Sequence, residues 1–162
     1  MVPLAAAPFS DPEGMSTNQD NDRVVVGVDG SPSSVEALRY GARIADALGA
    51  PLEAVITWER PRYVYLERDR EQNTGHAAAE RLRTAVSGAF GEETPAGFQD
   101  TALEGDAART LIELSASSGM LVLGSRGLGG FRGLLLGSVS RVCAEHAHCP
   151  VLIVHGGASP SE

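Results

Sequence analysis

The sequence of 162 residues contains no lysine, and all thirteen of its basic residues are arginine. This absence excludes every mechanism that needs a lysine as nucleophile or as the phosphate ligand of a P-loop. The four histidines have no motif that pairs them with a catalytic partner, and the Gly-x-Ser-x-Gly turn of serine hydrolases is also missing. The chain therefore offers no recognisable catalytic constellation.

Cysteine is scarce, because Cys143 and Cys149 are the only two and lie in one C-terminal stretch. A disulfide between them would close a very short loop, so we expect two small, buried, reduced thiols in a reducing cytoplasm. The alternative is a metal site that adds His146 and His148, but these spacings match no standard zinc motif.

Aromatic residues make up 5% of the chain, and no apolar run approaches the roughly 20 residues that cross a membrane. The N-terminus is mildly apolar, but it lacks a basic segment and is interrupted by Pro3 and Pro8, so no signal peptide is predicted. The net charge of −8 disfavours binding to nucleic acid or to anionic membranes. We therefore expect a cytoplasmic protein without nucleic-acid or membrane partners.

The length suits one domain with a core of its own. Residues 1–22 are expected to form a flexible N-terminal tail, since most of this segment is polar and rich in Pro, Gly, Asn and Asp. Met15 lies in this tail, and translation from it is a hypothesis that the intact mass of the native protein would test. The domain is predicted to span 23–155, and residues 156–162 to form a C-terminal tail.

Apolar runs alternate with helical periodicities along the predicted domain. Apolar runs that end abruptly predict buried strands, and apolar residues spaced by three and four predict the helices between them. The first helix is expected to begin with the cap Ser31-Pro32 and to end at Gly49, and Asp106 is expected to cap the helix that follows it. The predicted strands are 23–29, 52–58, 98–103, 120–123 and 150–154. This alternation predicts an α/β fold, an open five-stranded parallel sheet with helices on both faces, Rossmann-like.

Two strand ends carry unusual sequence, at the edge where an open α/β sheet binds its ligands. One is Asp29-Gly30-Ser31, and the other is the glycine-rich loop, residues 124–138. Glycine at positions 124 and 127 of this loop permits positive φ and close backbone approach, and its N–H groups can face an anion.

A helix that opens at Gly137-Ser138 adds the free N–H groups of its first turn, which attract phosphate. Arg126 and Arg132 add positive charge that can pair with phosphate oxygens. The alternatives are a glycine-rich loop that serves only tight turns, a solvated Arg132, and an Asp29 that only caps the first helix. The segment is neither a P-loop nor a dinucleotide fingerprint.

The spacing Gly124-x2-Gly127-x9-Gly137-Ser138 resembles the ATP-binding signature of the universal stress protein family. The resemblance extends to residues 24–31, to Gly105-Asp106-Ala107 and to residues 149–154, and it covers about 23–155. One departure is Gly119, where family members commonly have an acidic residue. The resemblance implies an adenine nucleotide alpha hydrolase-like fold.

The resemblance also implies a set of nucleotide-binding residues. Asp29 would lie near the adenosine and the metal–phosphate region, and Thr57, with Ile56 or Val55 as alternatives, near adenine. Leu123 and Gly124 would flank the ribose, and Arg126 would reach the phosphates. The implied phosphate cradle consists of Gly127, Gly137, Ser138, Val139 and Ser140.

These implied residues include no catalytic base, so we expect a regulator of the stress response that binds ATP and Mg²⁺ and hydrolyses ATP slowly at most. The charged segment 59–70 is a possible lid. A homodimer is implied by the resemblance, and the apolar strand Val151–Val154 is the candidate edge for it, since an unpaired strand edge invites a partner. The alternatives are a nucleotide-free dimeric interaction scaffold, a slow ATPase, and an ATP-dependent ligase or pyrophosphatase of the related architecture.

Overall fold

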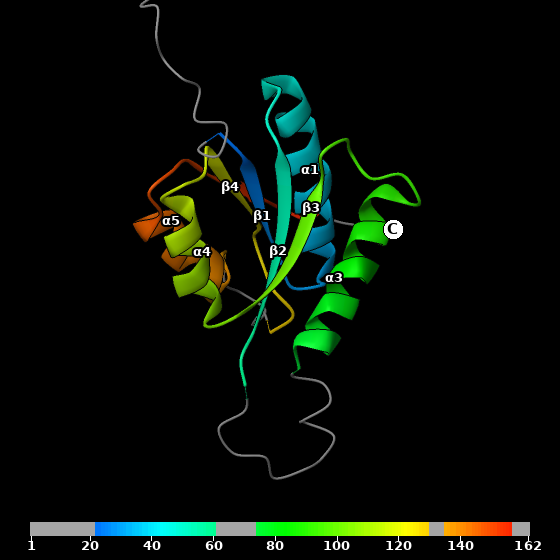
Figure 1. Ribbon diagram of the computed structural model, residues 1–162. Helices are drawn as coiled ribbons and strands as arrows, with labels where there is room; N and C mark the ends of the chain where they lie inside the picture. The colour runs from blue at the N-terminus through cyan, green and yellow to red at the C-terminus, as the bar shows by residue number, and fades with distance from the viewer. Residues whose placement is uncertain (1–21, 61–73, 130–134, 157–162) are drawn as a thin grey trace, which may run out of the picture.

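The computed structural model describes residues 22–60, 74–129 and 135–156. Five strands form one sheet in the order β3-β2-β1-β4-β5, and every neighbouring pair is parallel (Figure 1). The strands are β1 Val24–Val28, β2 Leu52–Trp58, β3 Gln99–Glu104, β4 Met120–Gly124 and β5 Val151–Val154. The predicted open parallel sheet is confirmed.

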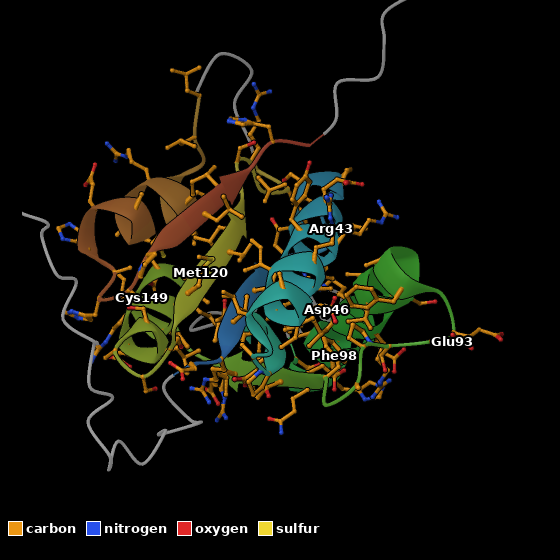
Figure 2. The ribbon with its side chains drawn as sticks, turned by 90° about the horizontal axis from the view of Figure 1, so that it is seen from above. Arg43, Asp46, Glu93, Phe98, Met120 and Cys149 are labelled. Atoms are coloured by element: carbon orange, nitrogen blue, oxygen red, sulfur yellow. The ribbon has the colours of Figure 1, made fainter. Side chains whose placement is uncertain are left out.

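Two pairs of helices cover the two faces of this sheet. Helices α1 (Pro32–Leu48) and α3 (Gly75–Phe90) pack against each other over one face, and α4 (Ala107–Ser115) and α5 (Ser138–His146) over the other (Figure 2). Each pair closes its own apolar core, and the fully buried β1 residue Val25 belongs to the α4–α5 side. Both faces are therefore covered, as the near-continuous apolar strands require.

The helix ends follow the predicted signals. The Ser31 hydroxyl accepts a hydrogen bond from the Ser34 N–H at 3.2 Å, Pro32 occupies the first turn, and Gly49 ends α1 in the left-handed conformation with φ 62°. The Asp106 carboxylate caps α4 by accepting from the Arg109 N–H at 2.9 Å. No helix in the described ranges is long and apolar enough to cross a membrane.

The order of the strands places the ligand edge of the sheet. From β1 the chain adds β2 and β3 on one side, and β4 then returns to the other side of β1. Helix α1 leaves β1 over one face, whereas α5 follows β4 over the opposite face. This switch point opens a crevice at the carboxyl ends of β1 and β4, where both unusual strand ends of the sequence lie.

Helix α1 lies so close to β1 that one of its positions admits only glycine. A Cβ atom on Gly41 would stand 2.5 Å from Val26 Cγ2, and Val26 is fully buried. Gly88 in α3 has the opposite surroundings, since a Cβ there would meet only Val35 Cγ1, at 3.9 Å.

Gly41→Ala should lower the free energy of unfolding by about 1–3 kcal/mol, the usual cost of overpacking a core, although alanine is the better helix former. Gly88→Ala is the matched control and should raise it by up to about 1 kcal/mol. Urea unfolding followed by circular dichroism measures both variants. Stabilisation by both substitutions would contradict the close packing of α1 on β1.

Candidate functional site

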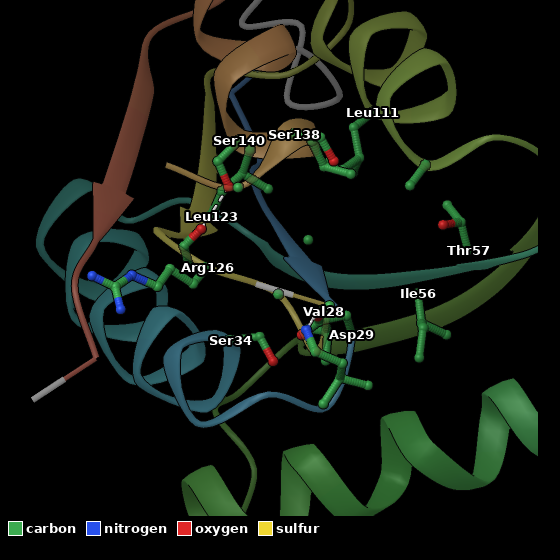
Figure 3. A pocket seen from close by; sticks show the side chains of 18 of the residues that line it. Val28, Asp29, Ser34, Ile56, Thr57, Leu111, Leu123, Arg126, Ser138 and Ser140 are labelled. Atoms are coloured by element: carbon green, nitrogen blue, oxygen red, sulfur yellow. Dashed lines mark hydrogen bonds between the residues drawn. The ribbon is translucent and has the colours of Figure 1, made fainter. Parts of the chain in front are cut away.

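A cavity of about 500 Å³ opens at the switch point, between β1, β2, β4 and the helices on the two faces (Figure 3). All ten residues predicted for the ligand site line it, and so do Val55 and Ile56, the two alternatives to Thr57. The ten are Asp29, Thr57, Leu123, Gly124, Arg126, Gly127, Gly137, Ser138, Val139 and Ser140. The fold therefore brings the predicted site residues together, although their binding roles stay predictions.

The carboxylate of Asp29 connects the two strand ends. Its Oδ1 accepts a hydrogen bond from the Ser31 N–H, and its Oδ2 accepts one from the Leu128 N–H, each at 2.9 Å. The first bond shapes the turn into α1, and the second holds the start of the glycine-rich loop against β1. The alternative role of Asp29 as the cap of α1 is not what the structure shows, because Ser31 is the N-cap.

Two glycines at the start of the glycine-rich loop are required for close approach. A Cβ on Gly127 would lie 2.6 Å from Asp29 Oδ2, and one on Gly124 would lie 2.5 Å from Ser33 Oγ and 2.8 Å from the Ser33 carbonyl carbon. Neither glycine has positive φ, which corrects that part of the sequence interpretation. The absence of a Cβ atom, and not the left-handed conformation, explains these two positions.

Further hydrogen bonds fix both ends of the loop. The Arg126 carbonyl accepts from the hydroxyls of Ser31 and Ser33, and the Ser125 carbonyl accepts from the Gly137 N–H at 2.7 Å. The Ser140 hydroxyl donates to the Gly124 carbonyl at 2.6 Å. The start of α5 is thereby held beside the end of β4.

The N-terminus of α5 is open toward a ligand. Its N-cap is Gly137, which has no side chain to accept from the first-turn N–H groups. The Ser138 hydroxyl is exposed at the cavity wall, whereas that of Ser140 is already bonded to Gly124. Free first-turn N–H groups together with the helix dipole favour an anion at this place.

Two arginines are found among the described residues that line the cavity, and the sequence interpretation named one of them. Arg126 lines the cavity, but its guanidinium points away from the cavity centre in Figure 3. Arg132 and most of the segment 59–70, the possible lid, lie outside the described residues. A cation that the sequence interpretation missed is Arg81 of α3, which lines the cavity.

Helix α4 contributes apolar cavity wall through Ala107 and Leu111, and α1 contributes Ser34. Ala78 and Leu82 on the apolar face of α3 are buried core residues, and Arg81 stands between them in the helical pattern. The sequence signal for Arg81 as a cavity residue is its position beside the apolar face of a helix. This signal is not specific, because solvated arginines occupy such positions as well.

The thiols are poor nucleophiles in this fold. Both cysteines are free. Cys143 is buried as expected, whereas Cys149 is only partly buried. Burial raises the pKa of the Cys143 thiol to about 11. Burial also raises the pKa of the Cys149 thiol. Over the described parts of the chain, no three His, Cys, Asp or Glu side chains cluster as a metal site would require. The metal site built on His146 and His148 is therefore not formed by these residues.

The model of the universal stress protein family matches residues 20–155. A universal stress protein of Mycolicibacterium smegmatis is 33% identical over 140 residues, covering 82% of this chain and 48% of that protein. A universal stress protein solved in complex with cAMP is 28% identical with a TM-score of 0.56, covering 85% of this chain and 99% of that one. The structure of UspA from Lactobacillus plantarum has a TM-score of 0.63 at 18% identity, covering 83% and 97%.

The chain spans about half the length of the curated relatives that it matches. The family match nevertheless covers all five strands and all four helices described above. On the fold, the glycine-rich loop and these matches, the chain belongs to the universal stress protein family.

Proposed function

We propose that the cavity binds an adenine nucleotide, namely ATP with Mg²⁺, and that the bound nucleotide makes the protein a regulator in the stress response. One observation supports this proposal most directly. The same cavity is lined by an open helix N-terminus, by a glycine-rich loop and by an apolar slot. The two halves suit the two chemistries of a nucleotide.

The polar half suits the phosphates. Gly127 and the first turn of α5, from Gly137 to Ser140, offer backbone N–H groups, and Ser138 offers a hydroxyl. Backbone donors and a helix dipole bind phosphate without a lysine, which this chain lacks. The Arg126 side chain is exposed, so it is free to turn toward a bound phosphate.

The apolar half suits the nucleoside. Val55 and Ile56 of β2, Ala107 and Leu111 of α4, and Leu123 of β4 all line this half of the cavity. Figure 3 shows Leu111 and Ile56 on opposite sides of it. Flat bases bind in slots of this kind, where most of the lining is apolar and a few polar groups set the orientation. The related protein that was solved with cAMP supports an adenine nucleotide as the ligand.

The residues present fit a magnesium ion that arrives with the nucleotide. Asp29 is the one carboxylate among the described residues that line the cavity. Mg²⁺ is commonly bound by one or two carboxylates together with phosphates and water, and it neutralises phosphate charge. Asp29 would be the protein ligand, since each of its oxygens keeps a lone pair beyond its one N–H bond.

We propose binding without dedicated catalysis. Hydrolysis needs a base that orients water at the γ-phosphate. Both oxygens of Asp29 already accept backbone N–H groups, and no histidine is found among the described residues that line the cavity. The scaffold alternative differs from this proposal in nucleotide affinity, because a scaffold would bind no ATP. The slow-ATPase alternative differs in phosphate release. A reducing cytoplasm, where the two free thiols persist, is the proposed location.

We also propose a homodimer through β5, one of the two edge strands of the sheet. The other edge, β3, carries Asp100 and Glu104, and charge on an edge strand prevents pairing, whereas β5 is entirely apolar. The carbonyls of Pro150 and Val154 accept from β4, so by strand alternation the backbone of Val151 and Ile153 faces outward. A second β5 could pair with these groups.

Calorimetry with ATP and Mg²⁺ tests the site. Gly137→Val should lower ATP affinity by at least about tenfold, because its methyl groups would occupy the phosphate half of the cavity. The fold should tolerate this change, since Gly137 has φ −66° and a Cβ there meets its neighbours at 3.5 Å or more.

Gly88→Ala is the control and should bind ATP like the wild type. Equal ATP binding by wild type and Gly137→Val would exclude the glycine-rich loop as the site, and no binding by the wild type would favour the scaffold. Phosphate release in the titrated samples should stay far below one turnover per second, a low rate for an enzyme.

Ile153→Pro tests the dimer, because proline removes an outward N–H and leaves the β4–β5 ladder intact. Sedimentation velocity should show a dimer for wild type and Ile153→Val and a monomer for Ile153→Pro, with circular dichroism confirming the fold. A dimer that persists in a folded Ile153→Pro variant would contradict pairing through this edge.

A further inference from the structure

Arg81 of α3 has an unusual environment for an arginine. It lines the cavity, and its Nε atom is buried and has no hydrogen-bond partner on any residue that the structure describes. Two other buried side-chain atoms share this property, Arg23 Nε and Glu53 Oε2. Those two belong to one ion pair, in which the Arg23 guanidinium lies 3.4 Å from Glu53. Arg81 has no ion pair of this kind within the described ranges.

A buried donor without a partner costs free energy, and native proteins rarely retain one without a reason. An arginine can donate five hydrogen bonds and cannot lose its charge at physiological pH. The neighbouring Arg83 shows the ordinary behaviour on this helix, because it is exposed and pairs with Glu80 one turn away. Arg81, in contrast, is held partly buried at a cavity wall.

The position of α3 decides which part of a ligand Arg81 meets. Figure 3 shows α3 on one side of the cavity and α4 and α5 on the other. The N-terminus of α5, the phosphate half, therefore belongs to the wall opposite α3. Helix α3 packs against β2 and β3, and β2 supplies Ile56 and Thr57 to the nucleoside half.

We propose that Arg81 is a specificity-determining residue that donates a hydrogen bond to the nucleoside of the bound nucleotide. The acceptor is a purine ring nitrogen or a ribose oxygen, both of which accept the N–H that the protein leaves unpaired. The phosphate cradle is built mainly from backbone and holds any polyphosphate, so Arg81 supplies selection for a nucleoside. This inference rests on the proposed nucleotide site.

Arg81→Met is the test, because methionine keeps an unbranched apolar stem and removes every donor. Affinities for ATP, adenosine and tripolyphosphate are measured by competition against a fluorescent ATP analogue. The variant should lose about 10- to 100-fold for ATP and for adenosine, the range of a hydrogen bond to a charged group, and nothing for tripolyphosphate.

A loss for tripolyphosphate as large as that for ATP would overturn the proposal and make Arg81 a phosphate ligand. An unchanged ATP affinity would also overturn it. The melting temperature of the ligand-free variant distinguishes a structural role of Arg81 from a ligand-binding role. Removal of an unpaired buried donor should not lower this temperature. A lower melting temperature with unchanged ATP affinity would mean that Arg81 pairs within the protein.

Arg83→Met is the matched control, because it removes an arginine from the exposed side of the same helix. It should leave all three affinities unchanged. Arg81→Lys keeps the charge but not the planar Nε–H donor, so it should restore only part of the ATP affinity. A wild type that binds neither ATP nor adenosine would refute the nucleotide site itself, whereas normal ATP binding by Arg81→Met would refute this inference alone.

Discussion

The carboxylate of Asp29 joins the two strand ends on which the cavity depends. With one oxygen it fixes the turn into α1, and with the other it holds the glycine-rich loop through the Leu128 N–H. So short a bridge requires that β1 and β4 be neighbours, and the reversal of strand order between them provides this. The bridge in turn requires glycine at position 127, because a Cβ there would collide with the bridging oxygen. The glycine at position 127 is thus a consequence of one carboxylate.

The sequence predicts the fold and the location of the site because both depend on local, repetitive signals. Apolar runs mark the strands, and the caps at Ser31 and Asp106 and the stop at Gly49 mark helix ends. All ten predicted site residues line one cavity because most belong to strand ends or to the first turn of α5. In a parallel sheet these places always meet at the same edge.

The features that could not be predicted depend on tertiary distances. Nothing in the local sequence shows that Gly124 faces Ser33, so close approach and positive φ are indistinguishable from the sequence alone. Side-chain direction is equally hidden, and Arg126 turns outward although its backbone lies at the cavity. Arg81 comes from a helix that no motif connects with the loop. Periodicity places it beside the core, but only the packing of α3 on β2 brings it to the cavity.

The absence of lysine and the net charge of −8 together constrain how such a site can bind an anion. The field of an acidic protein opposes the approach of a polyphosphate, and among the described residues only Arg81 and Arg126 bring positive charge to the cavity lining. Oriented N–H groups avoid the problem, because they act at contact distance and add no net charge to the surface. Their attraction is also short-ranged, so it does not discriminate among polyphosphates. In the proposed site, discrimination would come from the opposite wall, where Arg81 of α3 lines the cavity together with Ile56 and Thr57 of β2.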